Sequence, residues 1–100
     1  MSWNGVCVED SSDRLLPDEI SPKIPDQTPA KCIRACQDLG FSFAGVQDGI
    51  QCNCGDVAPP LDKIISMNEC TLPDCTNCRN CAGDPSKPCG GPYKMIVFEV

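Results

Sequence analysis

The sequence predicts a small, disulfide-rich domain of the α+β class. Its 100 residues leave room for one folded unit, so we expect a single domain over residues 1–100. Ten residues are cysteine, an even number at a density typical of disulfide scaffolds. One stretch carries the signals of a helix, and several short stretches favour strands. Because only five residues are aromatic, we expect disulfides rather than a large apolar core to hold the fold together.

The N-terminal quarter of the chain is predicted to be mostly extended. Residues 1–4 form a short leader, and Val6-Cys7-Val8 alternates weakly around a cysteine, which indicates a first strand. From Glu9 to Gln27 the chain carries turn-forming residues, acids and three prolines, which disfavour regular structure. We expect this segment to be a long, tethered loop.

A helix over residues 29–39 is the clearest element. Thr28 is a favourable N-cap residue, Pro29 suits the first helical position, and Gly40 is typical of a helix end. The residues that fall on one face at helical spacing are Cys32, Ile33, Cys36 and Leu39. We therefore expect this face to pack against the rest of the domain.

A hairpin and a closing strand complete the predicted regular structure. Phe41–Val46 has the composition of a strand, Asp48-Gly49 is a hairpin turn signal, and Ile50–Cys54 returns. The β-branched stretch Met95–Val100 favours a last strand. Between them, Asn68–Cys89 is rich in cysteine and is expected to be irregular.

Cysteine spacing links the helix to the hairpin. Cys32 and Cys36 lie on one helical face, about 6 Å apart along the axis. Cys52 and Cys54 point to the same side of a strand, roughly 6.6 Å apart. A helix lying on this strand can therefore form two bridges side by side. The spacing does not give the direction of the strand relative to the helix, so two sets of disulfides remain open. One set is Cys32–Cys52 with Cys36–Cys54, and the other is Cys32–Cys54 with Cys36–Cys52.

Three cysteines near the C-terminus have a competing interpretation. Cys75-x-x-Cys78-x-x-Cys81 resembles part of an iron–sulfur run, but Pro85 stands where the fourth ligand is required. A zinc site that adds Cys89 is the second alternative, and a redox-active C-x-x-C motif is the third. No thioredoxin-like βαβ pattern surrounds the motif. We therefore predict structural disulfides, with no metal and no cofactor.

Charge and composition exclude several classes of function. The net charge of −6 disfavours binding to nucleic acid. No apolar stretch reaches the roughly 18 residues of a membrane-spanning helix. The absence of histidine removes the commonest general base and the Ser-His and Cys-His nucleophile pairs. Disulfides form in oxidising compartments, so we expect the protein outside the cell, at the cell surface or in the secretory lumen.

Seven short motifs distributed along the chain together resemble a known family. They are Val6-Cys7, Asp13-Arg14-Leu15-Leu16-Pro17, Thr28-Pro29-Ala30-Lys31-Cys32 with Cys36, Phe43-Ala44-Gly45-Val46, Cys52-Asn53-Cys54-Gly55, Asn80-Cys81-Ala82-Gly83-Asp84-Pro85-Ser86 and Cys89-Gly90-Gly91-Pro92. Over nearly the whole chain this pattern is similar to the WSC domain, a module of fungal cell-wall stress sensors, wall-associated secreted proteins and animal receptors.

The resemblance implies a disulfide pattern and a fold. The implied pairs are Cys7–Cys70, Cys32–Cys52, Cys36–Cys54 and Cys81–Cys89, with Cys75–Cys78 as the simplest use of two extra cysteines. These extra cysteines fall in an insertion at about residues 71–80. The implied fold is PAN/apple-like: one helix packed on a twisted antiparallel sheet, with long disulfide-tied loops.

The resemblance also implies carbohydrate binding, which directs attention to particular side chains. A sugar has an apolar face and a polar rim, so its site combines an aromatic ring with amide and carboxylate groups. Trp3 and Tyr93 are the candidate stacking residues, although Trp3 could instead be a plug that closes one end of the sheet. The candidate polar rim lies on the hairpin and comprises Gln47, Asp48, Gln51 and Asn53.

We therefore interpret the sequence as a non-catalytic extracellular carbohydrate-binding module, with a cell-wall polysaccharide such as β-glucan as its partner. The alternative is an extracellular protein-interaction or spacer module that binds no sugar. A glycosidase would need two carboxylates across a cleft, which a small bridged domain rarely holds, so we predict no enzyme activity and no catalytic residues.

Overall fold

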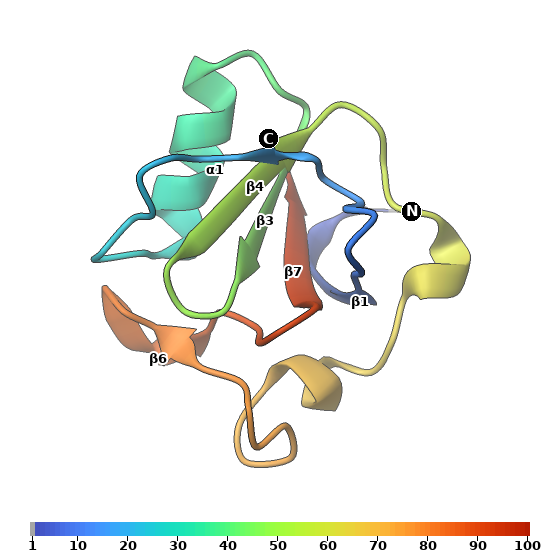
Figure 1. Cartoon of the computed structure of the whole chain (residues 1–100), viewed down its shortest axis with the longest axis vertical. Helices are drawn as coiled ribbons and strands as arrows, with labels where there is room; N and C mark the ends of the chain where they lie inside the picture. Colours follow the sequence, from blue (N-terminus) through green and yellow to red (C-terminus); the bar gives the residue numbers. More distant parts are fainter. Residues whose placement is uncertain (1) are drawn as a thin grey trace.

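The computed structural model describes residues 2–100, so Met1 of the predicted leader lies outside the described residues. It confirms the α+β class: a five-stranded antiparallel sheet, ordered β1-β7-β3-β4-β2, packs against helix α1, and β5 and β6 form a small second sheet (Figure 1). The elements are β1 (Asn4–Glu9), β2 (Asp18–Glu19), α1 (Pro29–Asp38), β3 (Phe43–Gln47), β4 (Gln51–Gly55), η1 (Leu61–Lys63), η2 (Met67–Cys70), β5 (Asn80–Cys81), β6 (Asp84–Pro88) and β7 (Lys94–Glu99).

Within residues 2–100, no helix is long and apolar enough to span a bilayer.

Two buried layers lie on the two faces of the sheet, because successive strand residues point to opposite sides. The layer that includes the inner face of α1 consists mainly of cysteine: Cys7, Cys32, Cys36, Ala44, Val46, Cys52, Cys54, Cys70, Cys81, Cys89 and Ile96. The opposite layer is smaller and comprises Trp3, Val8, Leu16, Met95 and Val97. Sulfur thus fills much of the space that apolar side chains would occupy in a larger domain.

Helix α1 confirms the predicted start and ends one residue earlier than predicted. The Thr28 hydroxyl accepts a hydrogen bond from the Lys31 backbone N–H at 3.1 Å, and Pro29 occupies the first turn. Leu39 is the C-cap, and Gly40 follows with a φ of 84°, a conformation that favours glycine. The buried helix residues are Cys32 and Cys36.

Replacing Thr28 by alanine should lower the free energy of unfolding by about 1 kcal/mol, because the Lys31 N–H loses its acceptor. Chemical denaturation of the oxidised protein measures the change. Thr76→Ala is the matched control, since Thr76 is exposed and lies outside the helix. Equal effects of the two substitutions would contradict the role of Thr28 as the cap.

Segments predicted to be irregular contain strands. The loop between Glu9 and Gln27 contributes β2, whose Asp18 and Glu19 pair with the edge of β4. The cysteine-rich segment contributes β5 and β6, which pair with each other. The prediction that these two segments are irregular was therefore wrong in part. Both contain short strands, whose pairing partners local sequence signals do not reveal.

The described chain begins and ends at the same end of the sheet. β1 and β7 are antiparallel neighbours, and Asn4 lies opposite Phe98. Next to this pair, the Glu99 N–H donates to the Trp3 carbonyl at 2.7 Å. The hairpin turn after Gln47 lies at the other end of the same strands, beyond the pairing of Gln47 with Met95.

Five disulfides use all ten cysteines. The pairs are Cys7–Cys70, Cys32–Cys52, Cys36–Cys54, Cys75–Cys78 and Cys81–Cys89. They are the same pairs that the family resemblance implies, and the two that join α1 to β4 follow the first of the two geometric alternatives. Every cysteine of the proposed iron–sulfur and zinc alternatives is thus bonded to another sulfur rather than available as a thiolate.

Candidate functional site

The tip of the β3–β4 hairpin meets the cysteine-rich segment, and the two form the wall of a groove. Asp48 and Gly49 turn the chain with φ angles of 52° and 84°, as expected for an Asp-Gly hairpin turn. The Gly49 N–H donates to the Cys89 carbonyl at 3.3 Å, and the Gly49 carbonyl accepts from the Ala82 N–H at 3.2 Å. Figure 1 shows this turn directed toward the end of the molecule that carries β6.

This hairpin groove has a volume of about 640 Å³ and a mixed lining. The residues that line it are Lys23, Asp48, Gly49, Ile50, Gln51, Leu72, Cys78, Arg79, Asn80 and Ala82. A second hollow of about 340 Å³ shares Asp48, Cys78 and Arg79 with the groove and reaches Pro92. The two together form an elongated concave strip rather than a closed pocket.

Ion pairs neutralise the charges along the strip. Arg79 Nε lies 3.4 Å from Asp48 Oδ1, and Lys23 Nζ lies 3.1 Å from Glu19 Oε2. All four side chains are largely exposed, so these pairs contribute little to stability and rearrange easily. The strip therefore offers hydrogen-bond donors and acceptors without a strong net charge.

Tyr93 follows the strip residue Pro92 in the chain, although its own side chain lines neither hollow. It is 46% exposed and has a φ of 54°, which is unusual for a tyrosine. The guanidinium carbon of Arg14 lies 5.0 Å from the ring centroid, a cation–π contact that occupies one ring face.

A buried polar network holds Tyr93 in this conformation. The Asp10 N–H donates to the Tyr93 carbonyl at 2.9 Å, and the Asp10 carboxylate accepts from Arg14 Nη1 at 3.0 Å. With its amide oxygen toward the loop, Gln47 accepts from the Tyr93 N–H at 3.0 Å and from Arg14 at 3.2 Å. Asp10 and Gln47 are both buried, at 4% and 2% exposure. Because several hydrogen bonds fix the backbone, the unusual φ of Tyr93 is maintained before any ligand binds.

The three predicted amides do not form an exposed rim. Gln47, Gln51 and Asn53 are only 2%, 8% and 1% exposed. Their side chains lie on the sheet face away from α1, where Gln51 Nε2 donates to Asn53 Oδ1 at 3.4 Å. The prediction of a polar rim on the hairpin is corrected here: Gln47 is bonded to Tyr93 and Arg14, and the Asn53 amide contacts the Gln47 amide. Of the four predicted rim residues, Asp48 and Gln51 line the groove.

Trp3 is also unavailable for stacking on a sugar. It is 6% exposed and belongs to the smaller buried layer with Val8, Leu16 and Met95. Its backbone N–H donates to Glu99 Oε1 at 2.9 Å. The Trp3 backbone lies beside Glu99, at the opposite end of the strands from the hairpin turn, and the buried ring is consistent with the alternative of a plug.

Sequence reasoning missed the groove residues of the cysteine-rich segment. Leu72, Arg79 and Asn80 line the hairpin groove, and Thr76 and Asn77 line the adjoining hollow. The local signal for them was weak, since polar residues between cysteines are typical of any exposed loop. Only the contact of this segment with the hairpin tip reveals their common surface.

Comparison with known proteins identifies relatives along most of the chain. The model of the WSC domain family matches residues 4–91. "Xylosyltransferase oxt" of Drosophila melanogaster is 36% identical over 94 residues, which cover 93% of this chain and 10% of that protein. "Kremen protein 1" of Rattus norvegicus is 37% identical over 79 residues, 79% of this chain and 15% of that protein.

A fungal relative matches as well. A "WSC domain-containing protein" of Arthroderma benhamiae is 32% identical over 69 residues, which cover 67% of this chain and 9% of that protein. The chain thus spans only 9% to 15% of the length of these three relatives.

Proposed function

Because the chain belongs to the WSC domain family of cysteine-rich extracellular modules, we propose that it is a non-catalytic carbohydrate-binding module. The partner is a neutral polysaccharide, with a cell-wall polymer such as β-glucan as the leading candidate. The observation that carries this proposal is the half-exposed ring of Tyr93, which follows Pro92 of the charge-neutralised strip directly in the chain.

The ring supplies the apolar part of the proposed contact. A sugar ring stacks its C–H groups on an aromatic face, and the buried area provides most of the free energy of binding. Arg14 already occupies one face of Tyr93, so the sugar stacks on the other. Because the polar network fixes the backbone before binding, little conformational entropy is lost on association.

The strip supplies the polar part. Asp48, Arg79 and Asn80 offer carboxylate, guanidinium and amide groups to sugar hydroxyls along the hairpin groove. Ile50 and Leu72 add apolar surface between them. An elongated hollow of this kind suits several residues of an extended chain, and the paired charges favour a neutral glycan over a highly charged one.

The acid content of the strip supports binding without catalysis. Among the described residues that line the hairpin groove and the adjoining hollow, Asp48 is the single carboxylate. Glycosidases require two, held about 5 to 9.5 Å apart across the scissile bond. This chain covers only 10% of the fruit-fly protein named as a xylosyltransferase. We therefore do not assign transferase activity to this chain.

The proposal is tested by retention on insoluble polysaccharides. The oxidised protein is incubated with β-glucan, chitin, xylan and cellulose, and the fraction retained is compared with that of a denatured sample. We expect retention on at least one polymer, and release by soluble oligosaccharides of the same type. Absence of retention on all four would contradict the proposal and favour the alternative, a protein-interaction module, for which cross-linking to a soluble partner is the corresponding test.

Tyr93→Ala should weaken binding to the retained polymer by about tenfold, because it removes the stacking face. Tyr93→Phe keeps the ring and should retain most of the affinity. Titration with soluble oligosaccharides measures both variants. Leu39→Ala is the control for loss of an exposed apolar side chain, since Leu39 is 63% exposed at the end of α1. Equal affinity of the Tyr93→Ala variant and the unmodified protein would exclude Tyr93 from the site.

A further inference from the structure

One disulfide differs from the other four in its exposure. Cys75 is partly exposed, and Cys78 is 5% exposed. The eight cysteines of the other four bridges are each at most 1% exposed. A thiol in solution must reach a sulfur atom to open a disulfide, so the bridge with the partly exposed Cys75 is the most accessible of the five without prior unfolding.

The same bridge also encloses the shortest loop. Its cysteines are 3 residues apart in sequence, whereas those of the other bridges are 8, 18, 20 and 63 residues apart. On the chain-entropy account, the stability that a bridge contributes grows with the length of the loop it closes. Opening this bridge therefore removes little of the free energy that keeps the domain folded.

We propose that the Cys75–Cys78 disulfide is a thiol-modification site, which small dithiols open while the other four bridges remain closed. This inference concerns the cysteine-rich insertion and does not depend on glycan binding. It assigns no disulfide-exchange activity to the protein, only a reversible modification of one bridge.

The reaction has two steps. A thiolate of the dithiol attacks Sγ of the partly exposed Cys75, the Cys75–Cys78 bond breaks, and Cys78 leaves as a thiolate that takes up a proton. The second thiol of the reagent then attacks the sulfur joined to Cys75, which releases the Cys75 thiol and a cyclic disulfide. Two electrons pass from the dithiol to the protein. The Glu69 carbonyl oxygen, 3.5 Å from Cys78 Sγ, can accept a hydrogen bond from the new Cys78 thiol.

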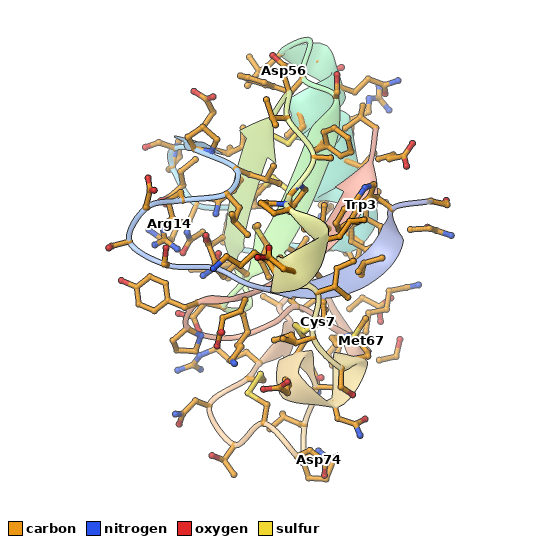
Figure 2. The ribbon with its side chains drawn as sticks, turned by 90° about the vertical axis from the view of Figure 1, so that its right-hand side faces the viewer. Trp3, Cys7, Arg14, Asp56, Met67 and Asp74 are labelled. Carbon is orange, nitrogen blue, oxygen red and sulfur yellow. A yellow bond between two sulfur atoms is a disulfide. The ribbon has the colours of Figure 1, made fainter. Side chains whose placement is uncertain are left out.

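The two halves of the opened bridge should behave differently. The chain stays anchored just after Cys78, because the Arg79 N–H donates to the Gly90 carbonyl at 2.8 Å and the Arg79 carbonyl accepts from Cys89 at 3.0 Å. Residues 71–77 are mostly exposed and include Asp74, which Figure 2 shows at one end of the molecule. Leu72 of this segment lines the hairpin groove. Opening the bridge should therefore loosen one wall of the groove and leave the sheet intact.

The test titrates the oxidised protein with increasing dithiothreitol under native conditions, followed by alkylation, intact-mass analysis and peptide mapping. We expect a concentration range in which each molecule carries two labels, both on Cys75 and Cys78, with an unchanged far-ultraviolet circular dichroism spectrum. Labels that appear first on any other pair, or on all ten cysteines at once, would overturn the proposal.

A matched variant and a second measurement sharpen the test. Cys75→Ser with Cys78→Ser should take up no label over the same concentration range, and labelling of this variant would show that another bridge is equally reactive. In the partly reduced wild type, amides of residues 71–77 should exchange with deuterium at least tenfold faster, and those of β3 and β7 should not change. Unchanged exchange in residues 71–77 would refute the loosening of the groove wall.

Discussion

Replacing Cys7 and Cys70 together by alanine is expected to lower the free energy of unfolding by about 4 kcal/mol. The two cysteines are 63 residues apart and both are buried, so their bridge closes the longest of the disulfide loops. Without it, the unfolded chain gains the entropy of that loop. The bridge is also the covalent link between β1 and η2, so its loss frees the N-terminal strand from the cysteine-rich half.

Thermal and chemical denaturation of the oxidised double variant measure the effect, and we expect a fall in melting temperature of at least about 15 °C. The matched control replaces Cys75 and Cys78 by alanine, which removes a bridge between residues only 3 apart. The control should lose far less stability. A larger loss in the control than in the Cys7/Cys70 variant would show that loop length does not govern stability in this domain.

Gly90→Ala should destabilise the protein by about 3 kcal/mol, through backbone strain and overpacking together. Gly90 has a φ of 69°, a conformation that costs free energy for any residue with a Cβ. A Cβ at this position would also overlap the carbonyl oxygen of Lys94. That oxygen belongs to the backbone and accepts a hydrogen bond from the Gly91 N–H at 3.0 Å, so it cannot move aside cheaply.

Gly40→Ala separates the two causes. Gly40 has a similar φ of 84°, but a Cβ there meets nothing within 4 Å. Its replacement should cost only about 1 kcal/mol, the strain of the backbone conformation alone. Equilibrium unfolding in guanidinium chloride compares the two variants. If both substitutions lower the free energy of unfolding equally, the contact with the Lys94 carbonyl oxygen does not contribute to the effect at Gly90.

The elements that the sequence predicted well are those with local signals. Thr28, Pro29 and Gly40 delimit α1 to within one residue, and Asp48-Gly49 places the hairpin turn, because caps and turns depend on residues a few positions apart. The strands β2, β5 and β6 were missed. Their pairing depends on partners brought close by the fold and by the disulfides, which a local pattern does not encode.

The candidate site was predicted only in part, for a related reason. Alternation along the hairpin correctly puts Gln51 and Asn53 on one side of the sheet, but it does not say what covers that side. On that side Arg14 and Tyr93 bind Gln47, and they come from segments about 80 residues apart in sequence. Tyr93 was a candidate because an aromatic residue after Gly90-Gly91-Pro92 is expected on a loop, and it is 46% exposed.

The neighbouring positions of the first and last strands determine how this domain can be mounted. Polypeptide attached before Trp3 and after Glu99 would leave from one spot, since those residues are hydrogen-bonded to each other. Asp48 lies at the opposite end of the same strands. If a stalk or further domains were joined at that end of the sheet, Tyr93 and the hairpin groove would lie at the end of the module farthest from the attachment.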